Sequence, residues 1–256
     1  MIEGLLLLSP GLAVAAIAVA LTAGFVKGAT GFAMPMIMIS GLGSFLPPDI
    51  ALAALILPTL VSNLWQAFRQ GLRAAMASAR QHWRYLAMVV IFIALATQLV
   101  VLLPSGMLFL ILGVPVVTFA LLQLIGWRPA ITERNRHTAE YGIGALAGIL
   151  GGLSGVWGPP TVLYHLAMNT PKRDAVRVQG VVYGTGSVVL FLGHLNSGIL
   201  NAATAPLSLA LVIPASVGMI NGFAVQDLLD QARFRHLTLV VLVVAGLNLI
   251  RRGLGY

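Results

Sequence analysis

Lys27 is the most informative candidate for chemistry in this chain, because it is a cation in a strongly apolar region. It lies in the stretch GFVKGATGFAMP, residues 24–35, where Thr30 supplies a hydroxyl group. A lysine within a membrane is costly and usually faces a cavity or an anion. The alternative is that the first apolar segment ends at Val26 and Lys27 extends its ammonium group to the interface. We expect a helix to begin near Thr30, so that its free N–H groups and its dipole form an anion site with Lys27.

A second glycine-rich interruption, GGLSGVWGPP, occupies residues 151–160. Both interruptions carry the spacing G-x-x-x-G-x-x-G, at Gly24, Gly28 and Gly31 and at Gly151, Gly155 and Gly158. Paired interruptions of apolar segments in two halves of a chain indicate a transporter's binding site. Pro159 suits the first turn of a helix that would start there. Close helix packing is the competing explanation of the glycines, and the two roles do not exclude each other.

Polar side chains also lie in the apolar segments that flank the interruptions: Ser62, Asn63, Gln66, Gln179, Tyr183, Thr185 and Ser187. Interhelical hydrogen bonding is their default explanation, and we expect Asn63 and Gln179 to be the exceptions. The predicted substrate-binding set is Lys27, Gly28, Thr30, Gly31, Asn63, Ser154, Gly155, Trp157, Gly158, Thr161 and Gln179. Tyr164 and His165 are a candidate protonation site, although a single histidine in an apolar segment is more often structural.

Other chemistries find little support in the sequence. All seven acidic residues lie near segment ends or in loops, and there is no cysteine. No carboxylate pair, HExxH helix, GxSxG elbow or P-loop is present. The sequence therefore argues against an enzyme, an ATP-driven pump and a carboxylate-based cation pathway, and it predicts no cofactor and no metal site.

Composition places these residues in a membrane protein. Of 256 residues, 59% are hydrophobic and 9% are charged, with mean hydropathy +0.95. Such a chain has too little charge to cover a soluble surface. The formal charge of +8 comes from basic residues in short loops between apolar segments. That distribution indicates membrane orientation rather than a nucleic-acid partner.

Ten apolar segments predict an all-α, polytopic helical bundle. They are Leu5–Val26, Phe32–Leu46, Ile50–Phe68, Tyr85–Leu103, Met107–Ile125, Tyr141–Leu153, Pro159–Asn169, Val176–Leu195, Pro206–Phe223 and Leu237–Ile250. The second, sixth and seventh are shorter than the ~20 residues of a full crossing. We predict that these three are half-helices or broken spans, which gives about 8–10 membrane segments.

The segments divide as five plus five. The glycine triplets correspond with an offset of 127 residues (151 minus 24), whereas residues 47–51 resemble residues 171–175 with an offset of 124 (171 minus 47), which implies a three-residue insertion. An odd number of segments in each half places the halves in opposite orientation, as an inverted repeat. We predict a first membrane repeat at 1–127, a cytoplasmic linker at 128–140 and a second repeat at 141–256.

Charge bias orients the bundle. Basic residues cluster in loops that we therefore place in the cytoplasm: Arg69, Arg73, Arg80, Arg84, Arg128, Arg134, Arg136, Lys172, Arg173, Arg177, Arg233 and Arg235. Both termini then lie outside, and Arg251 and Arg252 are the exceptions to the rule.

The duplicated interruptions, the run G-x-x-x-G-x-x-G-x-x-x-P from Gly24 to Pro35 and the cytoplasmic central loop resemble the TauE/SafE family of bacterial sulfite exporters. The resemblance covers essentially the whole chain, and Trp157 with Pro159-Pro160 departs from the family's glycine-rich pattern. It implies export of sulfite or an organosulfonate such as sulfoacetate across the bacterial cytoplasmic membrane. We expect alternating access, in which the two halves rock around an anion held near the midplane. The expected partners are the anion and membrane lipid. Transport or import of another small organic anion, a non-transporting scaffold and a homodimer stay open.

Overall fold

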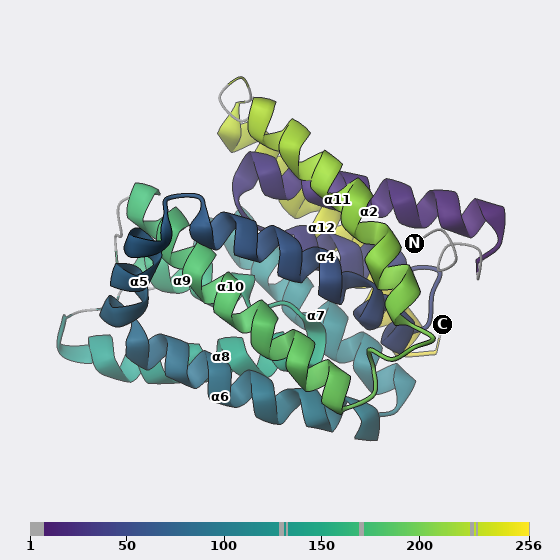
Figure 1. Ribbon diagram of the computed structural model, residues 1–256, viewed down its shortest axis with the longest axis horizontal. Helices are drawn as coiled ribbons and strands as arrows, with labels where there is room; N and C mark the ends of the chain where they lie inside the picture. The colour runs from purple at the N-terminus through teal and green to yellow at the C-terminus, as the bar shows by residue number, and fades with distance from the viewer. Residues whose placement is uncertain are drawn as a thin grey trace.

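The computed structural model describes residues 8–127, 131, 133–168, 172–225, 228 and 230–255, and these residues form eleven α-helices (Figure 1). They are α2 (Pro10–Thr30), α3 (Met34–Leu42), α4 (Pro48–Phe68), α5 (Leu72–Gln81), α6 (Trp83–Leu99), α7 (Ser105–Leu124), α8 (Arg136–Ser154), α9 (Gly158–Ala167), α10 (Lys172–Asn196), α11 (Ala205–Val225) and α12 (Gln231–Gly253). Two 3-10 helices, η1 (Val100–Leu102) and η2 (Glu133–Asn135), complete the described elements. The all-α prediction is confirmed.

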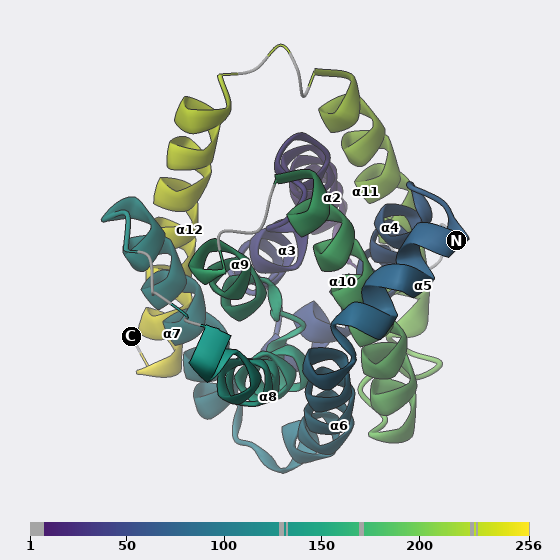
Figure 2. The same cartoon turned by 90° about the vertical axis from the view of Figure 1, so that its left-hand side faces the viewer.

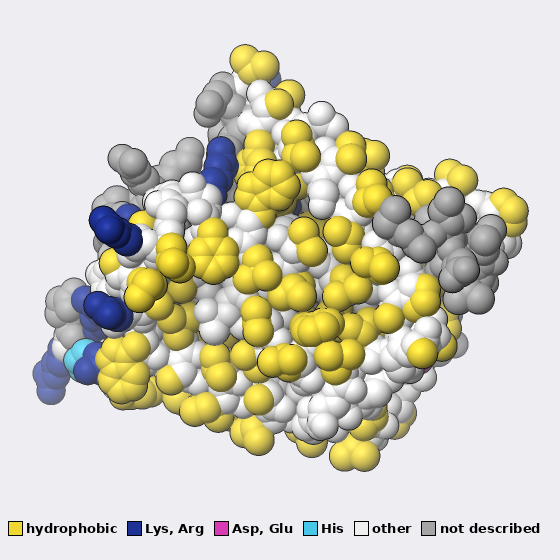
Figure 3. Space-filling view, viewed as in Figure 1, with side chains coloured by type: hydrophobic (Ala, Val, Ile, Leu, Met, Phe, Trp, Pro, Cys, Tyr) yellow, Lys and Arg dark blue, Asp and Glu magenta, His cyan; other side chains and the backbone are white. Residues whose placement is uncertain are grey.

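Six of the helices are long and apolar enough to cross a membrane: α2, α4, α6 with η1, α7, α10 from Arg177, and α11. Many large apolar side chains remain on the outside, as on a surface that faces lipid, and Figure 3 shows them spread over one broad face. A polytopic membrane fold is thus confirmed in its coarse form.

Two of the predicted boundaries change. The arginine-rich loop predicted after the third segment contains α5, a short helix with an apolar and a polar face. The sixth segment was predicted to be short, but α8 has 19 residues because it begins at Arg136, inside the predicted linker. Its first turns escaped detection because they are charged, and Arg136 pairs there with the buried carboxylate of Glu140. α3 and α9, with 9 and 10 residues, are as short as predicted.

The long helices pack as pairs arranged around α3 and α9 (Figure 2). The most extensive packing joins α2 with α11, α6 with α8, α7 with α12, and α4 with α10. Each of these pairs combines one helix from residues 8–127 with one from residues 133–255. The two parts of the chain are therefore interleaved rather than packed as separate bodies.

Glycines allow the closest of these approaches. A Cβ atom at Gly24 would lie 2.0 Å from the carbonyl oxygen of Ala215, and one at Gly28 would lie 2.2 Å from that of Met219. α2 runs unbroken through both positions to Thr30, so a helix end at Val26 is wrong. The packing explanation therefore holds for Gly24 and Gly28, as expected of small residues at membrane helix interfaces.

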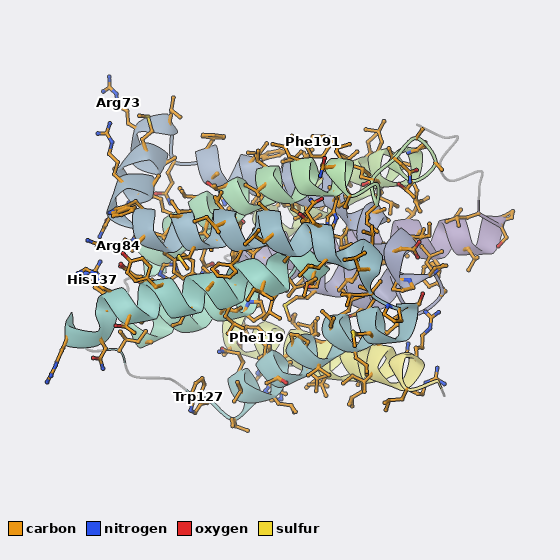
Figure 4. All side chains as sticks on the ribbon, turned by 90° about the horizontal axis from the view of Figure 1, so that it is seen from below. Arg73, Arg84, Phe119, Trp127, His137 and Phe191 are labelled. Carbon is orange, nitrogen blue, oxygen red and sulfur yellow. The ribbon has the colours of Figure 1, made fainter. Side chains whose placement is uncertain are left out.

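Charged side chains mark one end of the bundle, where Figure 4 places Arg73, Arg84 and His137. The start of α2 and the end of α12 lie toward the opposite end (Figure 1). Arg252, an exception to the charge rule, donates to the backbone carbonyls of Gly43 and Leu46, directly after α3, and lies over the Phe109 ring at 4.3 Å. Its positive charge thus stabilises the C-terminal, carbonyl end of the short helix α3.

Some predicted features fall outside the described residues. They are the chain before residue 8, Arg128, Asn169, and the side chains of Lys172, Arg173 and Arg235.

Candidate functional site

The first interruption lies after α2 and is shorter than predicted. Gly31 adopts a left-handed conformation (φ 84°), and its N–H group bonds to the carbonyl of Lys27 at 2.7 Å, which ends the helix. Ala33 is also left-handed (φ 74°), a conformation that costs a non-glycine residue about 1–2 kcal/mol. α3 starts only at Met34, so the prediction that a helix begins near Thr30 is wrong. The reason is that Gly31 caps α2 instead of opening the next helix.

The second interruption has the same construction. α8 ends at Ser154, Gly155 is left-handed (φ 71°) and its N–H group bonds to the carbonyl of Gly151 at 2.7 Å. α9 then begins at Gly158, where the sequence predicted a helix start. Left-handed glycine is the usual end of a helix, so among the described residues only Ala33 carries the strained backbone that is found at functional sites.

The correspondence between the interruptions has an offset of 124 residues, so the predicted offset of 127 is wrong. The left-handed caps Gly31 and Gly155 differ by 155 minus 31. Thr30 and Ser154 also match: each hydroxyl donates to the carbonyl four residues earlier and accepts the N–H of the residue two positions later. The motif G-x-x-x-G-x-x-G-x-x-x-P then recurs at residues 148–159, and no insertion is needed before residues 171–175.

The two interruptions face one another across a small cavity between the long helices. Its lining is Lys27, Phe32, Ala33, Pro35, Met36, Asn63, Gly155, Val156, Trp157, Gly158 and Tyr183. The cavity volume is about 20 Å³, which is close to the space that one water needs. In this conformation the cavity is too small for a polyatomic anion.

Lys27 is buried at the edge of the cavity, with 2% of its surface exposed. Its Nζ donates to Ser62 Oγ at 3.0 Å and to Asn63 Oδ1, both on α4. Among the described residues no carboxylate pairs with it. An ammonium group that is desolvated and held by neutral oxygens favours a negatively charged ligand. Extension of Lys27 to the interface is excluded by this position.

Two further polar groups at the cavity lack partners among the described residues. They are the Tyr183 hydroxyl group and the Asn63 Nδ2 amide, and both side chains are buried. Buried polar atoms usually find a partner in the protein or in bound water. With Lys27 they form a set of hydrogen-bond donors from α2, α4 and α10.

The N-termini of the short helices contribute unequally. The first bond within α3 runs from the Ile37 N–H group to the Ala33 carbonyl at 2.9 Å, so earlier N–H groups have no partner in the helix. In α9, Pro159 and Pro160 carry no N–H group, which leaves Gly158 as the donor of its first turn. Both helix dipoles still favour negative charge at these ends.

Five predicted residues line the cavity: Lys27, Asn63, Gly155, Trp157 and Gly158. The other six lie elsewhere in the structure. Gly28 packs against α11, and the Gly31 carbonyl accepts from Gln66 Nε2 at 3.1 Å. The hydroxyl groups of Thr30 and Ser154 bond to their own helices, as described above. Thr161 bonds to the Trp157 carbonyl at 2.8 Å and to the Tyr85 hydroxyl at 3.0 Å, and Gln179 is buried in α10.

Sequence reasoning missed Phe32, Ala33, Pro35, Met36, Val156 and Tyr183 as lining residues. Five of them have no polar side chain and reach the cavity because the chain turns there, which no residue type signals. Tyr183 carried a signal, a hydroxyl group in an apolar segment, that was attributed to helix packing.

Tyr164 and His165 belong to a second polar cluster near the arginine-rich end. The Tyr164 hydroxyl donates to the buried carboxylate of Glu140 at 3.1 Å, and its ring stacks on Tyr85 at 5.1 Å. The His165 ring lies 6.1 Å from that of His82. His165 is therefore not a single histidine, as the sequence suggested, but half of a buried pair.

Comparison with known proteins assigns the chain to a family. The family model for the sulfite exporter TauE/SafE matches residues 16–249. None of the curated proteins and none of the solved structures compared with it matches the chain. The match includes both interruptions, the cavity that they line and all of the long helices except the ends of α2 and α12. The chain therefore belongs to the TauE/SafE sulfite exporter family of multi-pass membrane transporters.

Proposed function

We propose that this protein exports sulfite or a small organosulfonate across the bacterial cytoplasmic membrane, with the substrate bound in the cavity between the two interruptions. The family match supports a transporter of small anions rather than an enzyme. The observation that carries the proposal is the buried ammonium group of Lys27, which faces the cavity with neutral partners only among the described residues.

The donors around the cavity suit an oxyanion. Lys27 supplies the charge, while Asn63 Nδ2 and the Tyr183 hydroxyl each supply an N–H or O–H group that has no partner among the described residues. The N-terminus of α3 adds backbone N–H groups and the positive end of its dipole. A sulfite or sulfonate group carries three oxygens, so several donors can bind it at once.

We infer an inverted repeat from the helix pairing, and such a repeat supports alternating access. Exchanging α2 with α8, α3 with α9, α4 with α10, α6 with α11 and α7 with α12 leaves the pattern of helix pairs unchanged: α2–α11 becomes α8–α6, and α4–α10 and α7–α12 map onto themselves. The same exchange relates the two interruptions, because their left-handed caps, Gly31 and Gly155, are 124 residues apart (155 minus 31). Such symmetry gives a transporter two related states around one site.

The interleaved helix pairs argue against the expectation that the two halves of the sequence move as rigid bodies. Two halves of the sequence that rock as bodies would have to separate all four extensive pairs. The α7–α12 pair makes few contacts with α2 and α8. We infer that the α7–α12 pair moves relative to α2 and α8, and that this movement opens the water-sized cavity to substrate. With a negative cell interior, each exported negative charge gains about 2.3 kcal/mol per 100 mV, so export needs no ATP.

The test is thermal stability and flux of the purified protein against sulfite, sulfoacetate, sulfate and acetate. A bound anion at 100 times its Kd should stabilise the fold by about 2.7 kcal/mol. Lys27→Met should abolish both this stabilisation and the flux, whereas Lys27→Arg should retain binding. Arg134→Gln changes an exposed arginine and is the matched control, so it should behave like the wild type. Lys27→Met removes a buried charge but also leaves Asn63 Oδ1 without its donor, so the stability of the ligand-free variant is measured in the same experiment.

Equal shifts in Lys27→Met and the wild type would contradict the proposed site. A shift with acetate or sulfate but none with sulfite and sulfoacetate would keep the site and replace the substrate class.

A further inference from the structure

A groove about 360 Å³ in volume lies between α4, α5 and α10, away from the cavity described above. Its walls are apolar: Ala67 and Phe68 come from α4, Leu72, Met76 and Ala79 from α5, and Val188 from α10. Phe68, Leu72, Met76 and Val188 are exposed. We call this surface the α5 groove. It is far larger than the anion cavity and has almost no polar lining, so it does not suit the transported anion.

The position of α5 determines the surroundings of the groove. Arg177 Nε donates to Ser78 Oγ at 2.8 Å, which fastens α5 to α10 at the arginine-rich end of the bundle. Figure 3 shows Lys and Arg side chains gathered at that end, beside the broad hydrophobic face. The groove therefore lies at the basic end of the bundle, next to its apolar surface.

Two exposed arginines of α5 lie on the same helix as the groove lining. Arg73, Met76 and Arg80 are spaced i, i+3 and i+7, so they share one ridge of α5. Met76 lines the groove, whereas Arg73 and Arg80 are exposed beside it. An amphipathic helix with a basic flank at the end of a membrane bundle is typical of contact with anionic headgroups.

We propose that the α5 groove binds an anionic phospholipid, with an acyl chain between α5 and α10 and the phosphate near Arg73 and Arg80. Charge complementarity selects this occupant over a second copy of the chain. A second copy of the chain in the same membrane orientation carries arginines at this end of the bundle, so it offers Arg73 and Arg80 no opposite charge. The proposal does not depend on which anion the protein transports.

The experiment is native mass spectrometry of the purified protein in mixed micelles with phosphatidylglycerol or phosphatidylcholine of equal chain length. We expect one tightly retained phospholipid, with phosphatidylglycerol preferred. Val188→Trp places a ring in the groove and should remove the bound phospholipid. Leu192→Trp is the control: it lies one turn further along α10 at another exposed position and should leave the lipid bound. Ala79→Leu is a second variant that fills the groove, from the α5 wall.

The double variant Arg73→Gln/Arg80→Gln should retain phosphatidylcholine but lose preference for phosphatidylglycerol, by about fivefold for each arginine. Equal lipid retention by Val188→Trp, Ala79→Leu and Leu192→Trp would overturn the proposal. So would a change from dimer to monomer in Val188→Trp with lipid retention unaltered, because the occupant would then be a second copy.

Discussion

At the scale of single residues, the proposed anion site combines a buried cation that has only neutral partners among the described residues with polar groups that have none there. Lys27 is held by the oxygens of Ser62 and Asn63, and the Tyr183 hydroxyl group has no partner among the described residues. Such groups lower stability when the site is empty and raise affinity when a ligand meets them. Binding and folding therefore make opposite demands on these side chains.

Tyr183→Phe tests that opposition. The variant should be as stable as the wild type or more stable, because a buried, unpartnered hydroxyl group is removed. Its Kd for the transported anion should rise roughly 10- to 100-fold, since a hydrogen bond to a charged group contributes about 1.5–3 kcal/mol. Thermal unfolding and a binding titration measure the two quantities. Lower stability with unaltered affinity would assign Tyr183 to helix packing.

His82, in the turn between α5 and α6, should give the protein a pH-dependent stability. Burial lowers the pKa of its imidazole, and Arg136 and Arg177 lower it further, while Glu140 opposes them. The folded state then binds fewer protons than the unfolded state, so stability is lost as the pH falls through about 6.5. Thermal unfolding between pH 5 and 7.5 should show this loss, and His82→Gln should reduce it. An unchanged pH profile in the variant would contradict the prediction.

At the scale of helices, glycine has two different tasks in this protein. Gly31 and Gly155 end α2 and α8 through left-handed conformations, and so create the interruptions. Gly24, Gly28, Gly144, Gly148 and Gly152 instead let α2 approach α11 and α8 approach α6. The same motif therefore supplies both the helix contact and the site beside it.

Gly24→Ala should destabilise the protein by about 1–3 kcal/mol or more, because its Cβ atom would overlap the backbone of α11. Gly142→Ala is the matched control on α8: its Cβ atom would meet nothing within 4 Å, so the change should stabilise the helix by about 1 kcal/mol. Unfolding in denaturant measures both. Equal effects would show that α2 and α11 can move apart at little cost.

At the scale of the whole molecule, the interleaving of the chain is the main feature. Each extensive helix pair joins the part before residue 128 to the part after it. A chain split between residues 130 and 131 and co-expressed as two fragments should therefore purify as a 1:1 complex. Gel filtration with a tag on one fragment measures this. Two fragments that fold and purify separately would contradict it, and would restore movement of the halves as bodies.

Prediction from the sequence succeeded where hydrophobicity and chain punctuation carry the information. The membrane class, the short α3 and α9 and the location of both interruptions follow from apolar runs broken by glycine and proline. Lys27 was found because a cation in an apolar segment is costly. Prediction failed where a helical stretch is amphipathic or charged. The amphipathic α5 was predicted as a loop, and the charged first turns of α8 were missed, so that its start was placed at Tyr141.

The sequence by itself determined the residue types of the site, since charge, missing N–H groups and glycine are properties of single positions. Only the tertiary structure decided which of them meet. Tyr183 and Asn63 reach the cavity because α10 and α4 pack together there, while Thr30, Ser154 and Thr161 bond elsewhere. The offset of 124 residues between the two interruptions also needed the fold, because glycines recur every few residues in these helices and only a left-handed backbone distinguishes a cap from a contact.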